Sequence, residues 1–316
     1  MNVKTRPSRT RFSVLSAVFA LALVGARAAE AEEGAKLFDT PEAAVAALEQ
    51  AAASYDRSAI LALFGPAAEG LENPDRVQAT NEMCAFKAAL GQSKRIVREA
   101  EDRCTLEVGA EAWPFPVPLV RQGGKWFFDA EAGKDELLSR RIGRNELSTL
   151  SSMRAYVEAQ RDYAAKDRDG DEVLEYAQKL VSAPGQKDGL YWPADMDGEI
   201  SPLGPFAAQA QREGYGSKAR EEGAGPEPFH GYYFKVLTAQ GKAAPGGKYS
   251  YIINKNMIGG FALVAWPASY GETGIMTFIV NQQGRVYQKD LGPDSDKVAA
   301  KIKAYDPDKT WSVSRA

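Results

Sequence analysis

Residues 259–290 read GGFALVAWPASYGETGIMTFIVNQQGRVYQKD, and this stretch decides the fold of the second half of the chain. The run from Phe261 to Trp266 is apolar throughout and ends at Pro267, which predicts a buried strand. Downstream, Ile275–Val280 and Arg285–Lys289 flank a short polar turn that contains glycine. This pattern predicts an antiparallel hairpin beside the buried strand.

The segments before and after this core in the sequence predict helices, a long loop and one further strand. Apolar residues recur at helical spacing over residues 145–164, and a second helix is expected over Glu172–Leu180. Residues 181–230 are rich in glycine, proline and charge, which predicts a long irregular loop. A strand over Tyr232–Leu237 and a C-terminal helix with Val298, Ile302 and Tyr305 complete the pattern.

The first half of the chain also begins with helices and continues with strands. Thr40-Pro41 is a typical helix start, and further helices are expected after Asp56 and over Asn81–Leu90. Strands are expected over residues 104–108 and 125–129, and an edge strand or an extended segment over 113–119. Helices followed by antiparallel strands are typical of α+β proteins. The sequence therefore predicts two α+β domains, at residues 37–143 and 144–316, each with helices packed on an antiparallel sheet.

Each half resembles a known group of folds. The stretches DTPEAAVAAL (39–48), DRSAILALFGP (56–66) and GGKWFFD (123–129) resemble nuclear-transport-factor-2-like proteins, which implies helices and a curved sheet around a cone-shaped cavity. The stretches RAYVEAQRDYAAKDRDGDEVLEYA (154–177), GYYFKVLTAQ (231–240) and GGFALVAWPASYGETGIMTFIVNQQGRVYQKDLG (259–292) resemble the soluble half of type IV pilins and pseudopilins. A polar domain replaces the hydrophobic stalk of the pilins, so assembly by the pilin mechanism is not expected. A fold of either kind assigns no function by itself.

Taken together, the two halves resemble an exported bacterial family that is catalogued as a domain of unknown function. The stretches that carry this resemblance are DRDGDEVLEYAQ (167–178), DGLYWP (188–193) and GGFALVAWPASYGETGIMTFIVNQQG (259–284). The resemblance implies export and a two-part architecture, and it implies no reaction.

The N-terminus has the features of a secretory signal peptide over residues 1–28. Four basic residues precede an apolar run from Phe12 to Val24, and Ala26-Arg27-Ala28 provides a small-residue cleavage pattern. The apolar run is shorter than the roughly 20 residues that a membrane-spanning helix needs. No cysteine follows it, so a lipid anchor is not expected. Residues 29–36 are rich in alanine and glutamate, which predicts a disordered linker.

Cleavage would change the charge of the chain and define its compartment. The segment 1–28 holds five of the 39 basic residues and none of the 42 acidic ones, so the net charge would change from −3 to −8. An acidic chain without a basic cluster is a poor partner for nucleic acid or for anionic membrane surfaces. The expected protein is soluble, periplasmic or secreted, without a stable membrane anchor.

Two cysteines, Cys84 and Cys104, are the only ones in the chain. In an oxidising compartment, an even pair of cysteines predicts a disulfide bond. The alternative is that both are buried thiols that pack as small apolar residues.

An acidic segment after the helix 145–164 is the strongest candidate for a metal site. Asp167, Asp169 and Asp171 alternate around a glycine, a spacing that can direct carboxylates at one calcium ion. The glycine and the last ligand do not match an EF-hand, so Glu172 or Glu175 would substitute in a different geometry, and Glu175 is taken as the candidate fourth ligand. The alternative is a helix start, in which Asp169 and Glu172 have a spacing similar to that of a capping box. The two interpretations are compatible.

For the other candidate residues, a structural role is favoured over a functional one. Asp188, Asp195, Asp197 and Glu199 surround the aromatic pair Tyr191-Trp192, which could stack on a sugar or hold a cation. The alternative is that the aromatic residues belong to the core and the acids are solvated. His230 is the only histidine, and without a Gly-x-Ser-x-Gly motif it is interpreted as the end of a loop. A further set could line a cavity or form a core: Trp113, Phe115, Trp126 and Phe128.

These observations favour a non-enzymatic envelope protein that binds or assembles with an envelope protein or a small ligand. The alternative is a hydrolase that uses the carboxylates between residues 167 and 199. No cofactor is required by either interpretation, and calcium is the candidate ion.

Overall fold

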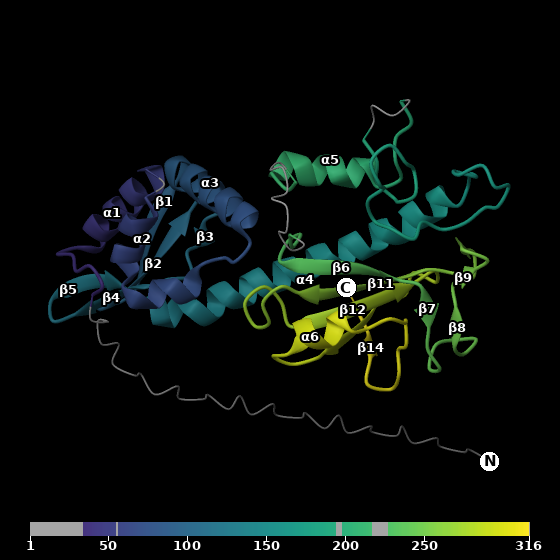
Figure 1. The fold of residues 1–316 in the computed structure, drawn as a ribbon. Helices are drawn as coiled ribbons and strands as arrows, with labels where there is room; N and C mark the ends of the chain where they lie inside the picture. The colour runs from purple at the N-terminus through teal and green to yellow at the C-terminus, as the bar shows by residue number, and fades with distance from the viewer. Residues whose placement is uncertain (1–33, 55, 194–197, 217–226, 316) are drawn as a thin grey trace, which may run out of the picture.

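The computed structural model describes residues 34–316, except for 55, 194–197, 217–226 and 316. The predicted signal peptide and most of the predicted linker lie outside the described residues. Two lobes lie side by side and are joined by one long helix, α4 (Ala130–Tyr163), as Figure 1 shows. In the described part of the chain, no helix combines the length and the apolar character needed to cross a membrane.

The N-terminal lobe packs helices on an antiparallel sheet. The strands are β1 (Lys94–Ala100), β2 (Arg103–Val108), β3 (Trp113–Pro114), β4 (Leu119–Gln122) and β5 (Lys125–Phe128). Their order is β1-β2-β4-β5, and β3 pairs with β2. The helices are α1 (Pro41–Ser54), α2 (Arg57–Phe64), the 3-10 helix η1 (Pro66–Leu71) and α3 (Arg76–Gln92). The expected strand over residues 113–119 is interrupted after Pro114, because prolines at alternate positions lack the N–H that a ladder requires.

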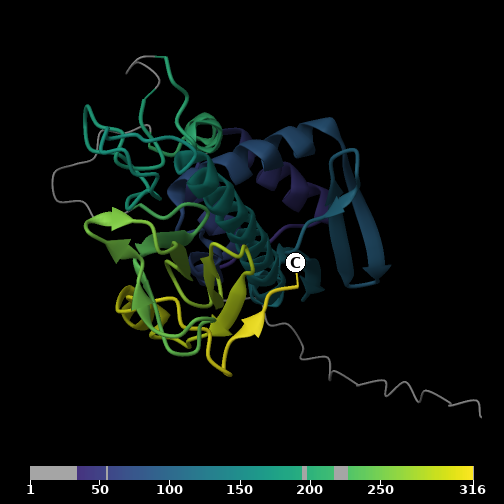
Figure 2. The same ribbon diagram turned by 90° about the vertical axis from the view of Figure 1, so that its right-hand side faces the viewer.

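The C-terminal lobe is built around residues 259–290, the stretch that predicted its strands. Its main sheet is antiparallel with the order β14-β13-β12-β11-β6. Strand β11 (Ala262–Pro267) is buried along its whole length, because α4 packs on one face of the sheet and α6 (Ser295–Ala300) on the other. Figures 1 and 2 show this sandwich from two sides. The remaining strands of the sheet are β6 (Tyr232–Leu237), β12 (Met276–Asn281), β13 (Tyr287–Asp290) and β14 (Ser312–Val313).

Two small ribbons extend the C-terminal lobe at its far end. One pairs β7 (Ala239–Gln240) with β8 (Tyr249–Ser250), and the other pairs β9 (Ile252–Ile253) with β10 (Asn256–Met257). Helices combined with antiparallel sheets in two lobes confirm the predicted α+β class.

Four further details differ from the expected elements. The C-terminal helix α6 ends at Ala300, so Ile302 and Tyr305 lie beyond it. Helix α4 begins at Ala130, not near residue 145, and therefore runs through the predicted domain boundary. The predicted irregular loop contains α5 (Gly204–Glu213). The helix predicted over residues 172–180 was wrong, because this segment is extended along α4 and β10. Gln160 explains the difference, since its side-chain amide accepts from the N–H of Ala177 at 2.9 Å and donates to its carbonyl at 2.8 Å.

The predicted disulfide bond between Cys84 and Cys104 is absent. Cys84 lies exposed on α3, whereas Cys104 is fully buried on β2 with its side chain in the core of the N-terminal lobe. The residues of α3 that meet this core include Leu90 and Ala89, so Cys84 is on another face of the helix. Burial raises the pKa of the Cys104 thiol, which suits a small apolar core residue.

A buried set of polar side chains joins the two lobes at the middle of α4. Asn145 is fully buried there, and its amide donates to the carbonyl of Thr273 in the C-terminal lobe at 2.9 Å. Its oxygen accepts from the amide of Gln78 on α3, in the N-terminal lobe, at 2.8 Å. The side chain of Asn145 is therefore hydrogen-bonded to both lobes. A buried amide is stable only while its N–H group and its oxygen both keep their hydrogen-bond partners.

Asp75 adds a second buried link beside Asn145. One carboxylate oxygen caps α3 through the N–H of Gln78 at 3.0 Å. The other accepts from the hydroxyl of Tyr215 at 2.7 Å and from the N–H of Gly231 at 3.1 Å. Gly231 has a φ of 73°, and a Cβ there would lie 2.7 Å from the amide nitrogen of Asn145, so only glycine fits. We call Asp75, Gln78, Asn145, Tyr215, Gly231 and Thr273 the polar junction.

Removing Asn145 should weaken the whole molecule. Asn145→Ala leaves the Gln78 amide and the Thr273 carbonyl buried without partners, which should lower the free energy of unfolding by about 2–4 kcal/mol. Asn81→Ala is the control, because Asn81 donates to the carbonyl of Glu213 from an exposed position. It should cost less than about 1 kcal/mol. Equal losses in urea denaturation of the two variants would contradict the role given to the junction.

Candidate functional site

The three aspartates of the acidic segment converge immediately after α4 ends. Asp167, Asp169 and Asp171 each offer a carboxylate oxygen, and these oxygens all lie within 4.8 Å of one another on the exposed surface. The structure therefore brings together three of the four residues predicted as calcium ligands. Carboxylate oxygens so close to one another repel, and a hard cation would relieve this repulsion.

Backbone N–H groups shape this acidic loop. One oxygen of Asp167 accepts from Gly170 at 2.8 Å and from Asp169 at 3.2 Å, and the other accepts from Glu172 at 2.9 Å. The hydrogen bond from Gly170 is the largest of the effects that lower the pKa of Asp167. Asp171 accepts from the N–H of Val173 at 2.9 Å. No helix starts here, so the predicted helix start was wrong. The aspartate side chains nevertheless accept hydrogen bonds from backbone N–H groups, as the capping interpretation implied.

The fourth predicted ligand, Glu175, lies farther along the chain and is hydrogen-bonded to the C-terminal lobe. Its carboxylate accepts from the N–H of Met257 on β10 at 2.9 Å. Burial raises the pKa of Glu175, and the charges of Asp169 and Asp171 raise it further. Asn256 donates to Asp171 at 2.5 Å, so the acidic loop is also fastened to the β9–β10 ribbon. Glu175 is not part of the cluster formed by the three aspartates.

The second acidic group divides into residues with different roles. Glu199 accepts from Lys166 and Arg168 at 2.9 Å each and from Lys187 at 2.6 Å. The hydrogen bonds from Lys187, Lys166 and Arg168, in that order, lower the pKa of Glu199 to about 2. Asp188 pairs with Lys179. The positions predicted at Asp195 and Asp197 lie outside the described residues.

The aromatic residues beside these acids belong largely to the core. Trp192 is buried in the core of the C-terminal lobe, and the cations of Arg168 and Lys187 lie over its ring, 5.1 and 5.4 Å from its centre. Tyr191 is half-buried. The interpretation of Trp192 as a core residue therefore holds, and its ring is covered by protein cations.

His230 closes the loop that contains α5. Its Nε2 lies 2.9 Å from a carboxylate oxygen of Glu213 at the end of α5, and its ring packs on those of Tyr215 and Phe229. Its φ of 47° places the backbone in the left-handed region directly before Gly231. These contacts fit the prediction that His230 ends a loop.

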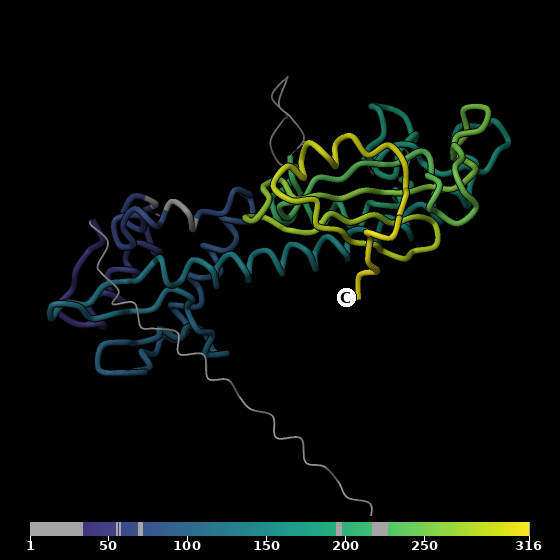
Figure 3. The backbone as a smooth tube through the Cα atoms, turned by 90° about the horizontal axis from the view of Figure 1, so that it is seen from below, coloured from purple at the N-terminus to yellow at the C-terminus, as the bar shows by residue number. Residues whose placement is uncertain are grey.

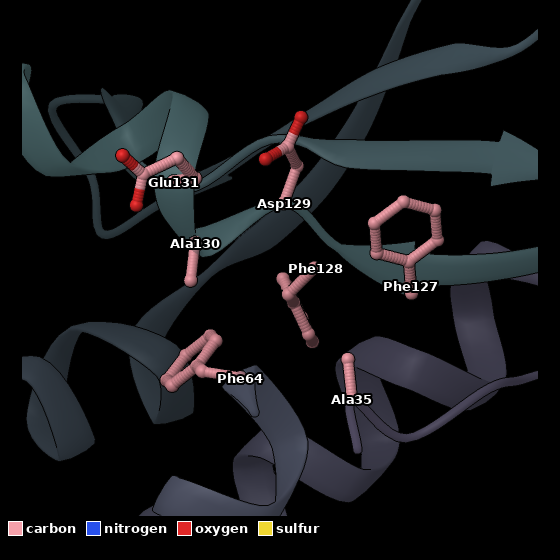
Figure 4. Close-up of a pocket in the computed structure, with 7 residues that line it drawn as sticks. All are labelled: Ala35, Phe64, Phe127, Phe128, Asp129, Ala130 and Glu131. Atoms are coloured by element: carbon pink, nitrogen blue, oxygen red, sulfur yellow. The ribbon is translucent and has the colours of Figure 1, made fainter. Parts of the chain in front are cut away.

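The aromatic residues of the N-terminal lobe fill its interior. Phe115 packs on the rings of Phe64, Phe86 and Phe128, with centres 5.1–6.3 Å apart. Trp126 is also in this core, while Trp113 is exposed under the guanidinium of Arg140. A pocket between α2 and the start of α4 has a volume of about 30 Å³, enough for a water molecule. In Figure 4 the rings of Phe64 and Phe128 face this pocket, and the carboxylate of Asp129 lies at its edge.

A larger groove lies along α4, and the sequence did not predict it. It has a volume of about 370 Å³ and is bounded by α4, by the sheet and by the C-terminal segment. The one available signal was Gly143, a glycine inside a helical segment, where alanine would stabilise the helix more. The lining residues come from parts of the sequence that no local pattern links: Gly143, Glu146, Leu147, Leu150, Phe278, Gln288, Ser314 and Arg315.

These features define a two-lobed α+β protein with an acidic loop at the end of a shared helix and a groove along that helix. The chain belongs to the family described as proteins of unknown function, DUF2950, whose model matches residues 35–314. No curated protein and no solved structure matches the chain. The family match supports the resemblance to a family of unknown function, while the likenesses to nuclear-transport-factor-2-like proteins and to pilins stay predictions.

The cluster around Glu199 should make stability depend on acid pH. The pKa of Glu199 is depressed in the folded state, so its contribution is complete above the ordinary glutamate value and is lost as pH falls toward about 2. Wild-type protein should therefore lose more unfolding free energy between pH 6 and pH 3 than Glu199→Gln does. Urea titrations at the two pH values measure this difference. The same loss in both proteins would show that other groups carry the acid sensitivity.

Calcium should bind at the three converging aspartates. Calorimetry of the purified protein with calcium chloride is expected to show saturable heat, because a cation relieves the repulsion among the carboxylates. The double variant Asp169→Asn, Asp171→Asn should remove this heat, and Asp188→Asn should leave it unchanged, since Asp188 is paired with Lys179. Absence of heat at millimolar calcium would refute the metal site.

Proposed function

We propose that this chain is an exported protein of the bacterial envelope that acts as a non-enzymatic binding or assembly module, in the periplasm or outside the cell. The sequence of residues 1–28 supports export, since it combines a basic start, a short apolar run and a small-residue exit. An envelope protein or a small ligand is the expected partner, and the acidic charge argues against nucleic acid.

The proposal rests on the ionisation and the hydrogen-bond partners of the carboxylates between residues 167 and 199. A carboxylate-dependent hydrolase needs one carboxyl with a raised pKa across a cleft from a second one. Here Glu199 is held ionised by three cations, Asp167 by three N–H groups, and Asp188 pairs with Lys179. These contacts suit acids that shape a surface, and the groove along α4 offers a place for a ligand.

One observation favours the alternative of a hydrolase. Glu175 has a raised pKa because it is partly buried near Asp169 and Asp171. A general acid needs such a shift. Its carboxylate already accepts from the N–H of Met257, which assigns it a structural contact as well.

Two measurements on the same preparation separate the two functions. Wild-type protein and Glu175→Gln are assayed on panels of glycans and esters, and both are used to retrieve partners from an envelope extract. The binding function predicts no turnover above that of Glu175→Gln, and retention of the same partner by both proteins. Robust turnover that Glu175→Gln abolishes would overturn the proposal in favour of the hydrolase.

A further inference from the structure

Strand β6 forms one border of the C-terminal sheet, and β11 is its neighbour on the other side. Figure 1 shows β6 next to β11, and Figure 3 shows the strands of this lobe side by side. The backbone groups of successive residues in a strand point to opposite sides. The N–H and C=O of Tyr232 bond to Phe229, at 3.1 and 2.9 Å, on the side away from β11. Phe234 and Val236 follow at every second position and therefore point the same way.

The outward N–H and C=O groups of Phe234 and Val236 have no hydrogen-bond partner in the described part of the chain. A hairpin that continued from Phe229 along β6 would place Glu227 opposite Phe234. Glu227 is exposed and makes no such bond. We call the four unpaired groups the open edge. They present donors and acceptors at the spacing of an extended peptide.

The open edge has a fixed length, because the chain closes both of its ends. Phe229 occupies the position beside Tyr232, and the N–H of Tyr251 donates to the C=O of Thr238 at 2.8 Å. The part of the strand between these two contacts is Tyr233–Leu237. At about 3.3 Å per residue, it offers room for roughly 17 Å of extended chain.

The other borders of the two main sheets have features that hinder the pairing of a further strand. Strand β1 carries Lys94, Arg95 and Arg98 and has a register shift after Arg98. Beside β5, the backbones of Phe38 and Trp126 exchange two hydrogen bonds, at 2.8 and 2.7 Å. Strand β14 has only 2 residues. Strand β6 has 6 residues in regular register, and the residues of its open edge are apolar.

The one charge on β6 does not shield the open edge. The ammonium of Lys235 lies at the end of α6, 2.6 Å from the carbonyl oxygen of Ala300 and 3.5 Å from that of Ala299. The side chains of Phe234 and Val236 are only partly buried against the core, so both leave apolar surface exposed. An added strand would therefore meet free peptide groups and apolar side chains.

A second copy of β6 does not fit the open edge, because each copy carries Phe229 on the side that would have to pair. A symmetric pair of β6 strands is antiparallel and places the Tyr232 end of one opposite the Thr238 end of the other. Paired strands lie about 4.8 Å apart, and Phe229 lies beside its own β6 at a similar distance. Phe229 would therefore occupy the space of the other strand. Lys235 would also face its own copy, and like charges in that position destabilise a pair.

We propose that β6 binds an extended peptide segment of a partner protein, which adds as a strand to the C-terminal sheet. The segment is about five residues long and lies in a terminus or a loop, free of flanking strands. Two alternate residues of the segment exchange N–H and C=O bonds with Phe234 and Val236, and their apolar side chains lie beside those of β6. The inference rests on the proposed binding function and names the class of partner.

The probe is the pentapeptide acetyl-Thr-Val-Thr-Val-Thr-amide, added to the whole protein. NMR titration should show saturable binding, with slower hydrogen exchange at the amides of Phe234 and Val236. Methylation of both valine nitrogens should weaken binding at least tenfold, because it removes two N–H groups that bond to β6. Methylation of the second and third threonine nitrogens is the matched control. It should leave binding nearly unchanged, because these N–H groups point away from β6.

Val236→Pro is the corresponding change in the protein. It removes an outward N–H and spares the bonds between β6 and β11, and proline is tolerated at such edge positions. Binding of the pentapeptide should weaken at least fivefold. Val313→Pro is the control at the opposite border of the sheet. The N–H of Ser314 donates to Val286, so by alternation the N–H of Val313 points away from β13. This variant should bind the peptide like the wild type.

The inference is wrong if the pentapeptide does not bind the wild type at millimolar concentration. It is also wrong if the two methylated peptides bind equally well, since contact with an apolar surface alone does not distinguish alternate N–H groups. Should Val236→Pro fail to fold, the methylated peptides decide on the wild-type protein. Hydrolysis of a glycan or an ester would overturn the proposed function alone, because peptide binding is measured without turnover.

Discussion

The buried hydrogen bonds of Asn145 constrain the rest of this molecule. Asn145 is in the middle of the one helix that both lobes share, and it binds a side chain of one lobe and a backbone carbonyl of the other. Since the amide is fully buried, neither bond can be exchanged for water without cost. The lobes are therefore held in one relative position. Gly143 and Leu147 lie within a turn of Asn145, so the same constraint fixes one wall of the groove.

The sequence predicted the parts of the fold that depend on local patterns. The apolar run of β11 and the polar turn before β13 identified the C-terminal sheet, because strands carry their signal in neighbouring residues. The segment 172–180 was misjudged, because its conformation depends on Gln160, a side chain of another element that bonds the backbone of Ala177. The polar junction was missed for a similar reason. Asn145 and Thr273 are 128 positions apart, and no periodicity links them.

The candidate sites also differ in whether a local sequence pattern could predict them. The three aspartates lie within five residues, so their spacing was enough to predict that their carboxylates converge. The predicted disulfide failed because a cysteine count does not show which face of a helix each cysteine occupies, and Cys84 lies away from the core that holds Cys104. The groove joins residues from α4, two strands and the C-terminal segment. Only the folded chain places Gly143 near Arg315.

The acidic loop keeps its negative charge because of a residue far from it in sequence. In the run Lys166-Asp167-Arg168-Asp169-Gly170-Asp171, cations and acids alternate, and the cations could have paired with the adjacent aspartates. Lys166 and Arg168 instead bind Glu199, and the guanidinium of Arg168 is also held between the rings of Tyr163 and Trp192. Among the described residues, no lysine or arginine pairs with the three aspartates. Glu199 thus holds Lys166 and Arg168 away from the three aspartates, so the field that a calcium ion would meet at the aspartates also depends on this carboxylate.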